Sequence, residues 1–156
     1  MAMNLQGIKS VCPIGPVSVT AGATVTSAVI DCKGYEELQL VVTRTTHATD
    51  YITTFQIQQS DDTNASNFAT VTGYVQGTST ASDFVISSLK GGTDAATEKA
   101  AGVFNIDLRG KKRYFRVLLT NGGSTAICGV TGTLARPEQA PITATLQNAG
   151  VVVNPS

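Results

Sequence analysis

Apolar and polar residues alternate with a period of two along most of the chain, which is the pattern of strands that bury one face. The clearest case is the segment 37–44, where Leu38, Leu40 and Val42 share one side. The same alternation predicts strands at 17–20, 25–30, 51–58, 68–76, 82–89, 103–108, 112–120 and 124–134. We therefore expect an all-β fold, a jelly-roll-like antiparallel β-sandwich of about eight strands with extended N- and C-terminal arms.

Turn-forming residues separate these strands. Ala21-Gly22 and Asn121-Gly122-Gly123 predict hairpins, because Gly and Asn tolerate positive φ. Gly129 and Gly132 lie inside the last predicted strand and indicate a bulge or a close backbone contact. The window 95–101 is rich in helix formers, but it is so short that we expect only a marginal helical turn there.

Prolines and glycines set the expected boundaries of the domain. Residues 1–15 are predicted to be an N-terminal arm, 16–136 the β-sandwich, and 137–156 a C-terminal arm that follows a proline-bounded linker. The run Val151-Val152-Val153 would promote aggregation if it were exposed, so we expect it to dock on this subunit or on another.

Composition narrows the partners. Charged residues make up only 14% of the 156 residues and the formal net charge is zero, so no overall field attracts nucleic acid or an anionic membrane. The weak charge repulsion between copies favours association. The first seven residues lack the basic start and apolar run of a secretory signal, and we expect synthesis in a cytoplasm.

Candidate chemistry is sparse. The three cysteines, Cys12, Cys32 and Cys128, are expected to be buried or half-buried free thiols. The single histidine, His47, has Asp50 three residues on, which a strand would place on the opposite face, so catalysis there is not expected. No phosphate loop, zinc-ligand set or catalytic carboxylate pair is present in the sequence, and we predict no enzyme activity, cofactor, metal or small-molecule substrate.

An acidic, amide-rich loop spans residues 60–67. Its Asp61-Asp62 pair, with Asn64 and Asn67, offers oxygen ligands that calcium accepts, but the spacing is not that of an EF-hand. We interpret this loop as an Asx-rich turn.

A basic cluster precedes and enters the strand 112–120, and it is interleaved with aromatic residues. Its members are Arg109, Lys111, Lys112, Arg113 and Arg116. With zero net charge we do not expect nucleic-acid binding; the preferred interpretation is a solvated turn whose long side chains cover sheet surface. Contact with an acidic partner surface is an alternative.

Three segments, 17–31, 58–68 and 107–117, resemble sequence segments of the capsid cement proteins, also called decoration proteins, of tailed bacteriophages. The resemblance covers residues 17–136. It implies a β-sandwich or jelly-roll subunit, commonly a homotrimer, made in the bacterial host cytoplasm and bound on the capsid exterior of the virion to the major capsid protein. The role that it implies is stabilisation of the capsid lattice.

The candidate interface combines the basic cluster with the apolar residues of the tail. Besides the five cations, it comprises Ile142, Leu146, Val151, Val152 and Val153. The alternative function is a phage tail, baseplate or fibre-associated β-domain, with binding of a host carbohydrate receptor as one form of that role. The absence of Trp and the presence of only four Tyr weaken this alternative, because carbohydrate sites favour aromatic platforms.

Overall fold

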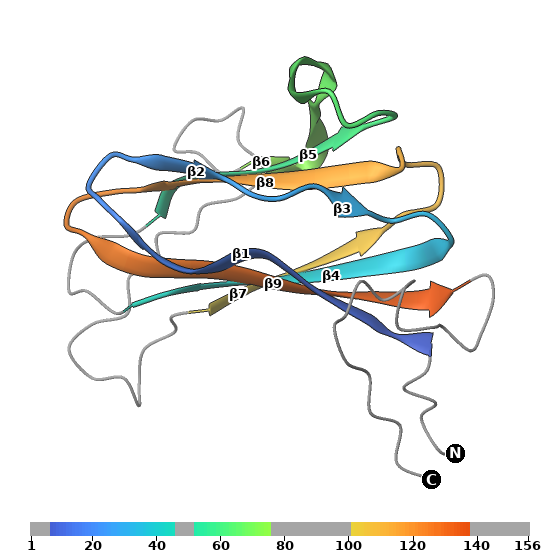
Figure 1. The fold of residues 1–156 in the computed structure, drawn as a ribbon, viewed down its shortest axis with the longest axis horizontal. Coiled ribbons are helices and arrows are strands. Elements are labelled where there is room, and N and C mark those ends of the chain that lie inside the picture. The colour runs from blue at the N-terminus through green and yellow to red at the C-terminus, as the bar shows by residue number, and fades with distance from the viewer. Residues whose placement is uncertain (1–6, 46–51, 76–100, 138–156) are drawn as a thin grey trace, which may run out of the picture.

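Two antiparallel sheets stack face to face in the computed structural model, which describes residues 7–45, 52–75 and 101–137 (Figure 1). A short 3-10 helix at Ala65–Asn67 lies in the loop after the fifth strand. The strands are β1 (Lys9–Val19), β2 (Thr24–Thr26), β3 (Ile30–Asp31), β4 (Tyr35–Arg44), β5 (Ile52–Ser60), β6 (Ala69–Val75), β7 (Ala101–Asp107), β8 (Tyr114–Asn121) and β9 (Ala126–Pro137). The predicted all-β sandwich is confirmed.

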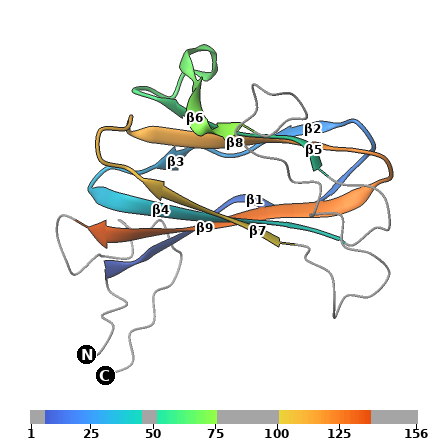
Figure 2. The same ribbon diagram turned by 180° about the vertical axis from the view of Figure 1, so that it is seen from behind.

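The strand order identifies the topology. One sheet has the order β1-β9-β4-β7, and the other has the order β2-β8-β5-β6 with β3 also paired to β8. If β2 and β3 are taken as one interrupted strand, the pairs β1 with β9, β2/β3 with β8, β4 with β7 and β5 with β6 are nested. A long hairpin rolled so that successive pairs alternate between two sheets is a jelly roll, as predicted (Figure 2).

The two predicted hairpins are wrong. Val19 pairs with Ala126 in one sheet, whereas Thr24 pairs with Thr120 in the other, so each turn carries the chain across the sandwich. The turn chemistry itself is as expected, since Gly22 has a φ of 71° and Gly123 a φ of 68°. Such residues determine that the chain reverses, but they do not determine which strand it then pairs with.

The predicted N-terminal arm, residues 1–15, includes residues that belong to the first strand of the sandwich. Residues 9–15 form the first part of β1, and Ile14 is only 4% exposed in the core. The prolines that suggested an arm are accommodated by register shifts between Val11 and Ile14 and between Ile14 and Val17. Bulges in an edge strand tolerate residues that cannot donate a backbone hydrogen bond.

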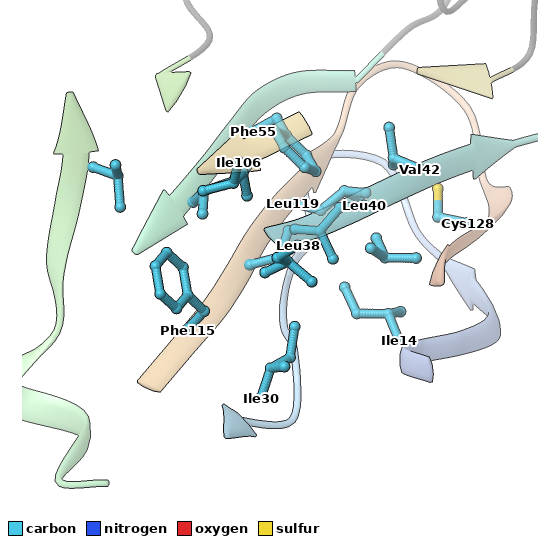
Figure 3. Packing of buried hydrophobic residues seen from close by; sticks show 14 of the residues in the cluster. Ile14, Ile30, Leu38, Leu40, Val42, Phe55, Ile106, Phe115, Leu119 and Cys128 are labelled. Carbon is cyan, nitrogen blue, oxygen red and sulfur yellow. The ribbon is translucent and has the colours of Figure 1, made fainter. Parts of the chain in front are cut away.

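The core fills the space between the sheets (Figure 3). Leu38, Leu40 and Val42 are at most 1% exposed, as their alternation predicts. The rings of Phe55 and Phe104 stack at 4.7 Å. Ile52 is also fully buried, out of phase with Phe55, because the register of β5 shifts between Ile52 and Thr54.

A buried polar cluster joins the two sheets at one end. Arg44, at the end of β4, donates from Nε to Asn121 Oδ1 at 3.0 Å, and both residues are at most 3% exposed. Asn121, at the end of β8, donates to the carbonyls of Val19 at 2.9 Å and Ser124 at 2.8 Å. These bonds satisfy the Asn121 side chain and Arg44 Nε, which would be costly to bury unpaired, whereas Arg44 Nη2 is buried without a hydrogen-bond partner among the described residues.

Several predictions concern residues outside the described part of the chain. They are the strand at 82–89, the helical turn before Ala101, His47 with Asp50, and the C-terminal residues after Pro137.

Candidate interaction surfaces

The basic cluster lies on the turn that joins β7 to β8. Gly110 has a φ of 73°, and the Lys111 amide donates to the Leu108 carbonyl at 2.9 Å, which closes the turn. A residue without a Cβ suits this conformation. The turn displays Arg109, Lys111, Lys112 and Arg113 as exposed residues, while Arg116 lies further along β8. We call the four exposed cations the basic turn.

Arg109 is paired with a neighbouring carboxylate. Its guanidinium donates to both oxygens of Asp107, and the shortest distance is 2.7 Å. These hydrogen bonds, with a further one from the Arg109 amide, lower the pKa of Asp107 to about 2. Asp107 lies only two positions from Arg109, so the sequence alone could have indicated this pair.

Two more cations of the basic turn are paired with distant parts of the chain. Lys112 Nζ lies 2.8 Å from Asp61 in the β5–β6 loop, and Arg113 lies 2.6 Å from Asp31 on β3. The hydrogen bond from Arg113 is the main reason why the pKa of Asp31 is lowered. Among the described residues, Lys111 is the cation of this turn without an ion pair. The positive charge available to a partner is therefore much smaller than the sequence suggests.

Arg116 covers an aromatic ring instead of extending into solvent. Its guanidinium lies 4.3 Å from the centre of the Phe68 ring, and its Nε donates to Gln58 Oε1 at 2.7 Å. Phe68 is consequently only 8% exposed. This contact is the one expected from long basic side chains that cover sheet surface.

The outer side of the β1-β9-β4-β7 sheet presents an uncharged face that was not predicted from the sequence. We define this uncharged face by Val41, Thr43, Val103, Ile127 and Thr131. Val41 pairs with Val103 on one side and with Thr131 on the other, so the residues are contiguous across three strands. Val103 is 56% exposed and Ile127 is 51% exposed. Apolar residues at both phases of β7 and β9 were the available signal, since an exposed strand face ordinarily alternates to polar residues.

Charged groups border one end of the uncharged face. Arg136 lies 3.2 Å from Glu36 and 3.0 Å from Glu37, and Gln39 donates to Asn105 at 2.9 Å between β4 and β7. An apolar centre with a polar border is the usual arrangement of a protein interface.

The cysteines differ in accessibility. Cys32 and Cys128 are buried free thiols, and burial raises the pKa of Cys32 to about 12 and also raises that of Cys128. Cys12, in contrast, is exposed. The expectation that it would be at least half-buried is wrong, because it lies in the bulged part of an edge strand.

The acidic loop is an Asx-rich turn, as predicted. Asn64 Oδ1 accepts from the Ser66 amide at 3.2 Å, and Asn67 donates to Asp62 Oδ2 at 2.8 Å. The bond from Asn67 is the largest cause of the lowered pKa of Asp62. Within the described ranges, no three His, Cys, Asp or Glu residues are grouped as metal ligands, and no helix is long and apolar enough to cross a membrane.

Comparisons with known proteins give similarities of fold at low identity. No protein-family model and no curated protein matches the chain. Among solved structures, it is similar to the SPBc2 prophage-derived protein YomS, with 12% identity and a TM-score of 0.41 over 83% of this chain and 93% of that one. It is also similar to a structure of the infectious bursal disease virus Gx strain, with 9% identity and a TM-score of 0.48 over 86% of this chain and 33% of that one. At TM-scores below 0.5 these similarities decide neither topology nor function, and the jelly-roll assignment rests on the strand pairing described above.

Proposed function

We propose that this chain is a non-enzymatic structural protein of a virion, which binds the outer surface of a phage capsid and stabilises the major-capsid lattice as a homotrimer. The observation that carries the proposal is the uncharged face, where Val103 and Ile127 are each more than half exposed on a sheet whose other side packs against the core. The resemblance of residues 17–136 to capsid decoration proteins supports the same role.

The chemistry of the uncharged face suits protein contacts. Interface centres are depleted of charge, and apolar side chains there lose contact with water on binding. A trimer would repeat each contact three times, so that individually weak contacts would add up to firm attachment. Basic-turn residues would border this contact, where charges influence the rate and salt dependence of association more than its strength.

The solution mass is the first test of the trimer. Light scattering of the purified protein over a range of concentrations should give a stable mass near three times the 16.2 kDa subunit. A monomer at every concentration would contradict a preformed trimer. That result would favour assembly only on the virion, or the tail, baseplate or fibre alternative.

Capsid binding needs a second test, in which co-sedimentation with capsids of the accompanying major capsid protein is measured at low and high salt. Reversing the charge of Lys111 should lower affinity more at low salt than at high salt, because exposed charges are screened within roughly 10 Å at 0.1 M salt. Reversing the charge of Lys112 is a less clear test of capsid binding, because that change also breaks the ion pair with Asp61 within the subunit. Equal binding by wild type and Lys111→Glu at low salt would remove the basic turn from the interface.

A further inference from the structure

A groove of about 980 Å³ runs beside the start of β1. Its walls are the first part of β1, the connection from β2 to β3, and the outer sides of β9 and β4. Residues that line it include Lys9, Cys12, Val29, Asp31, Val41 and Thr131.

The groove is largely uncharged and partly apolar. Val29 is 41% exposed on one wall, and Val41 is half-buried on another. Of the two charged lining residues, Asp31 already pairs with Arg113 at 2.6 Å. β1 is an edge strand. Its Pro13 carbonyl already accepts from the Ala28 amide at 3.0 Å, and the part of the edge before Pro13 offers backbone groups to a further extended segment.

The chain itself contains a segment that matches this groove. Residues 139–156 carry no Asp, Glu, Lys or Arg side chain, and they include the β-branched run Val151-Val152-Val153. An uncharged, β-prone segment binds an edge strand and an apolar wall without burying charge.

The last residue of β9 lies close to the start of the groove. Leu134 pairs with Lys9, so β9 ends at Pro137 close to the start of β1, where the groove begins. The 19 residues of 138–156 can span up to roughly 60 Å when extended, whereas the 11 residues of β1 span roughly 36 Å. The segment 138–156 is therefore long enough to extend along the whole of β1.

We propose that the segment 138–156 occupies the groove of its own chain and covers Val29 and the edge of β1. A covalently linked segment has an effective concentration near the millimolar range, which favours the groove of the same chain over that of a second copy. The groove includes Val41 and Thr131 of the uncharged face, but its test uses the isolated protein, so the outcome can be separated from that of capsid binding.

Cys12 provides a built-in probe of occupancy. It is exposed and lines the groove, whereas Cys32 and Cys128 are buried. Iodoacetamide labelling of the full chain, followed by mass spectrometry, should modify Cys12 at least about tenfold more slowly than in a Val151→Asp, Val152→Asp, Val153→Asp variant. The control is Ile127→Asp, which adds a carboxylate to the outer side of the same sheet, opposite Ser18 near the far end of β1, and should leave the Cys12 rate unchanged.

Two results would overturn the proposal. Equal Cys12 rates in wild type and in the triple variant would show that the segment does not cover the groove. Protection that disappears on dilution of the wild-type protein would show that the occupant is a second copy. If Cys32 and Cys128 also react in the triple variant, the variant has unfolded, and Val152→Asp alone then carries the test with the same two outcomes.

Discussion

On the outer face of the β2-β8-β5-β6 sheet, side chains of neighbouring strands bind one another. The uncharged face of the opposite sheet instead exposes aliphatic side chains. On the first, the hydroxyls of Thr24 and Thr120 lie 2.8 Å apart, and Arg116 binds Gln58 and covers Phe68. On the second, Val103 and Ile127 remain more than half exposed. A surface whose polar groups already bind one another gains little from a partner, while exposed aliphatic area gains about 25 cal/mol for each Å² that a partner covers.

The largest expected effect concerns the inner side of the sheet that carries the uncharged face. A Cβ at Gly132 would lie 2.8 Å from Leu40 Cδ2 and 3.1 Å from the Gln39 carbonyl oxygen. Overpacking of this kind costs about 1 to 3 kcal/mol, so Gly132→Ala should lower the midpoint of chemical denaturation accordingly. Such a loss would show that the inner side of this sheet is tightly packed, so that only its outer face is free to contact a partner.

Gly129 supplies the matched control for this substitution. A Cβ there would meet Thr43 Oγ1 at 3.4 Å, an ordinary contact, and Gly129→Ala should be close to neutral. Equal stability of both variants would show that β9 can shift to make room. The contrast between a rigid inner side and an open outer face would then fail.

The next effect tests the two outer faces directly. Val103→Asp combined with Ile127→Asp should weaken capsid co-sedimentation by about tenfold or more, because it places charges in a contact that must lose water. Leu118→Asp, an aliphatic-to-acid change on the outer side of β8, is the matched control and should leave binding unchanged. An equal loss for both variants would mean that capsid binding does not distinguish the faces.

Local patterns predicted the strands but not all of their partners. The phase of Leu38, Leu40 and Val42 was correct because one residue of slip would expose all three. The hairpins failed at Gly22 and Gly123, because turn residues contain no information about which sheet receives the next strand. The burial of Ile52 does not follow from the alternation in residues 51–58, because a shift in register, set by pairing with β8, moves this side chain into the core.

The same limit applies to the surfaces. The basic cluster was visible in the sequence, but its electrostatics depend on Asp31 and Asp61, which the fold brings from distant positions. Arg44 and Asn121 likewise gave no signal, since their hydrogen bond joins residues from opposite sheets. The alternation along β7 indicated that Val103 is exposed, but its contact with Val41 and Thr131 in one face depends on the strand pairing.

A smaller effect concerns the outer face of the β2-β8-β5-β6 sheet. Arg116→Ala should lower the free energy of unfolding by about 1 kcal/mol, because it removes the bond to Gln58 and uncovers the Phe68 ring. Arg109→Ala is the control, since its pair with Asp107 is solvent-exposed on both sides and such pairs contribute little. If the two variants were equally stable, the contact of Arg116 with Phe68 would not contribute to stability. The side-chain contacts on this face would then not distinguish it energetically from the uncharged face.

The smallest effect is a protonation change at the border of the uncharged face. Asp107 has a pKa of about 2 in the folded chain, lowered from 3.8, chiefly by its hydrogen bonds from Arg109. A depressed carboxyl pKa adds stability above its unfolded value and loses it as the pH falls, so this contribution should fade between pH 3.8 and about 2. An NMR titration of the Asp107 carboxyl should show the low pKa in the wild type and a rise towards the ordinary value in Arg109→Gln. An unchanged pKa in that variant would mean that other groups hold the carboxylate, and the border of the face would then not depend on this pair.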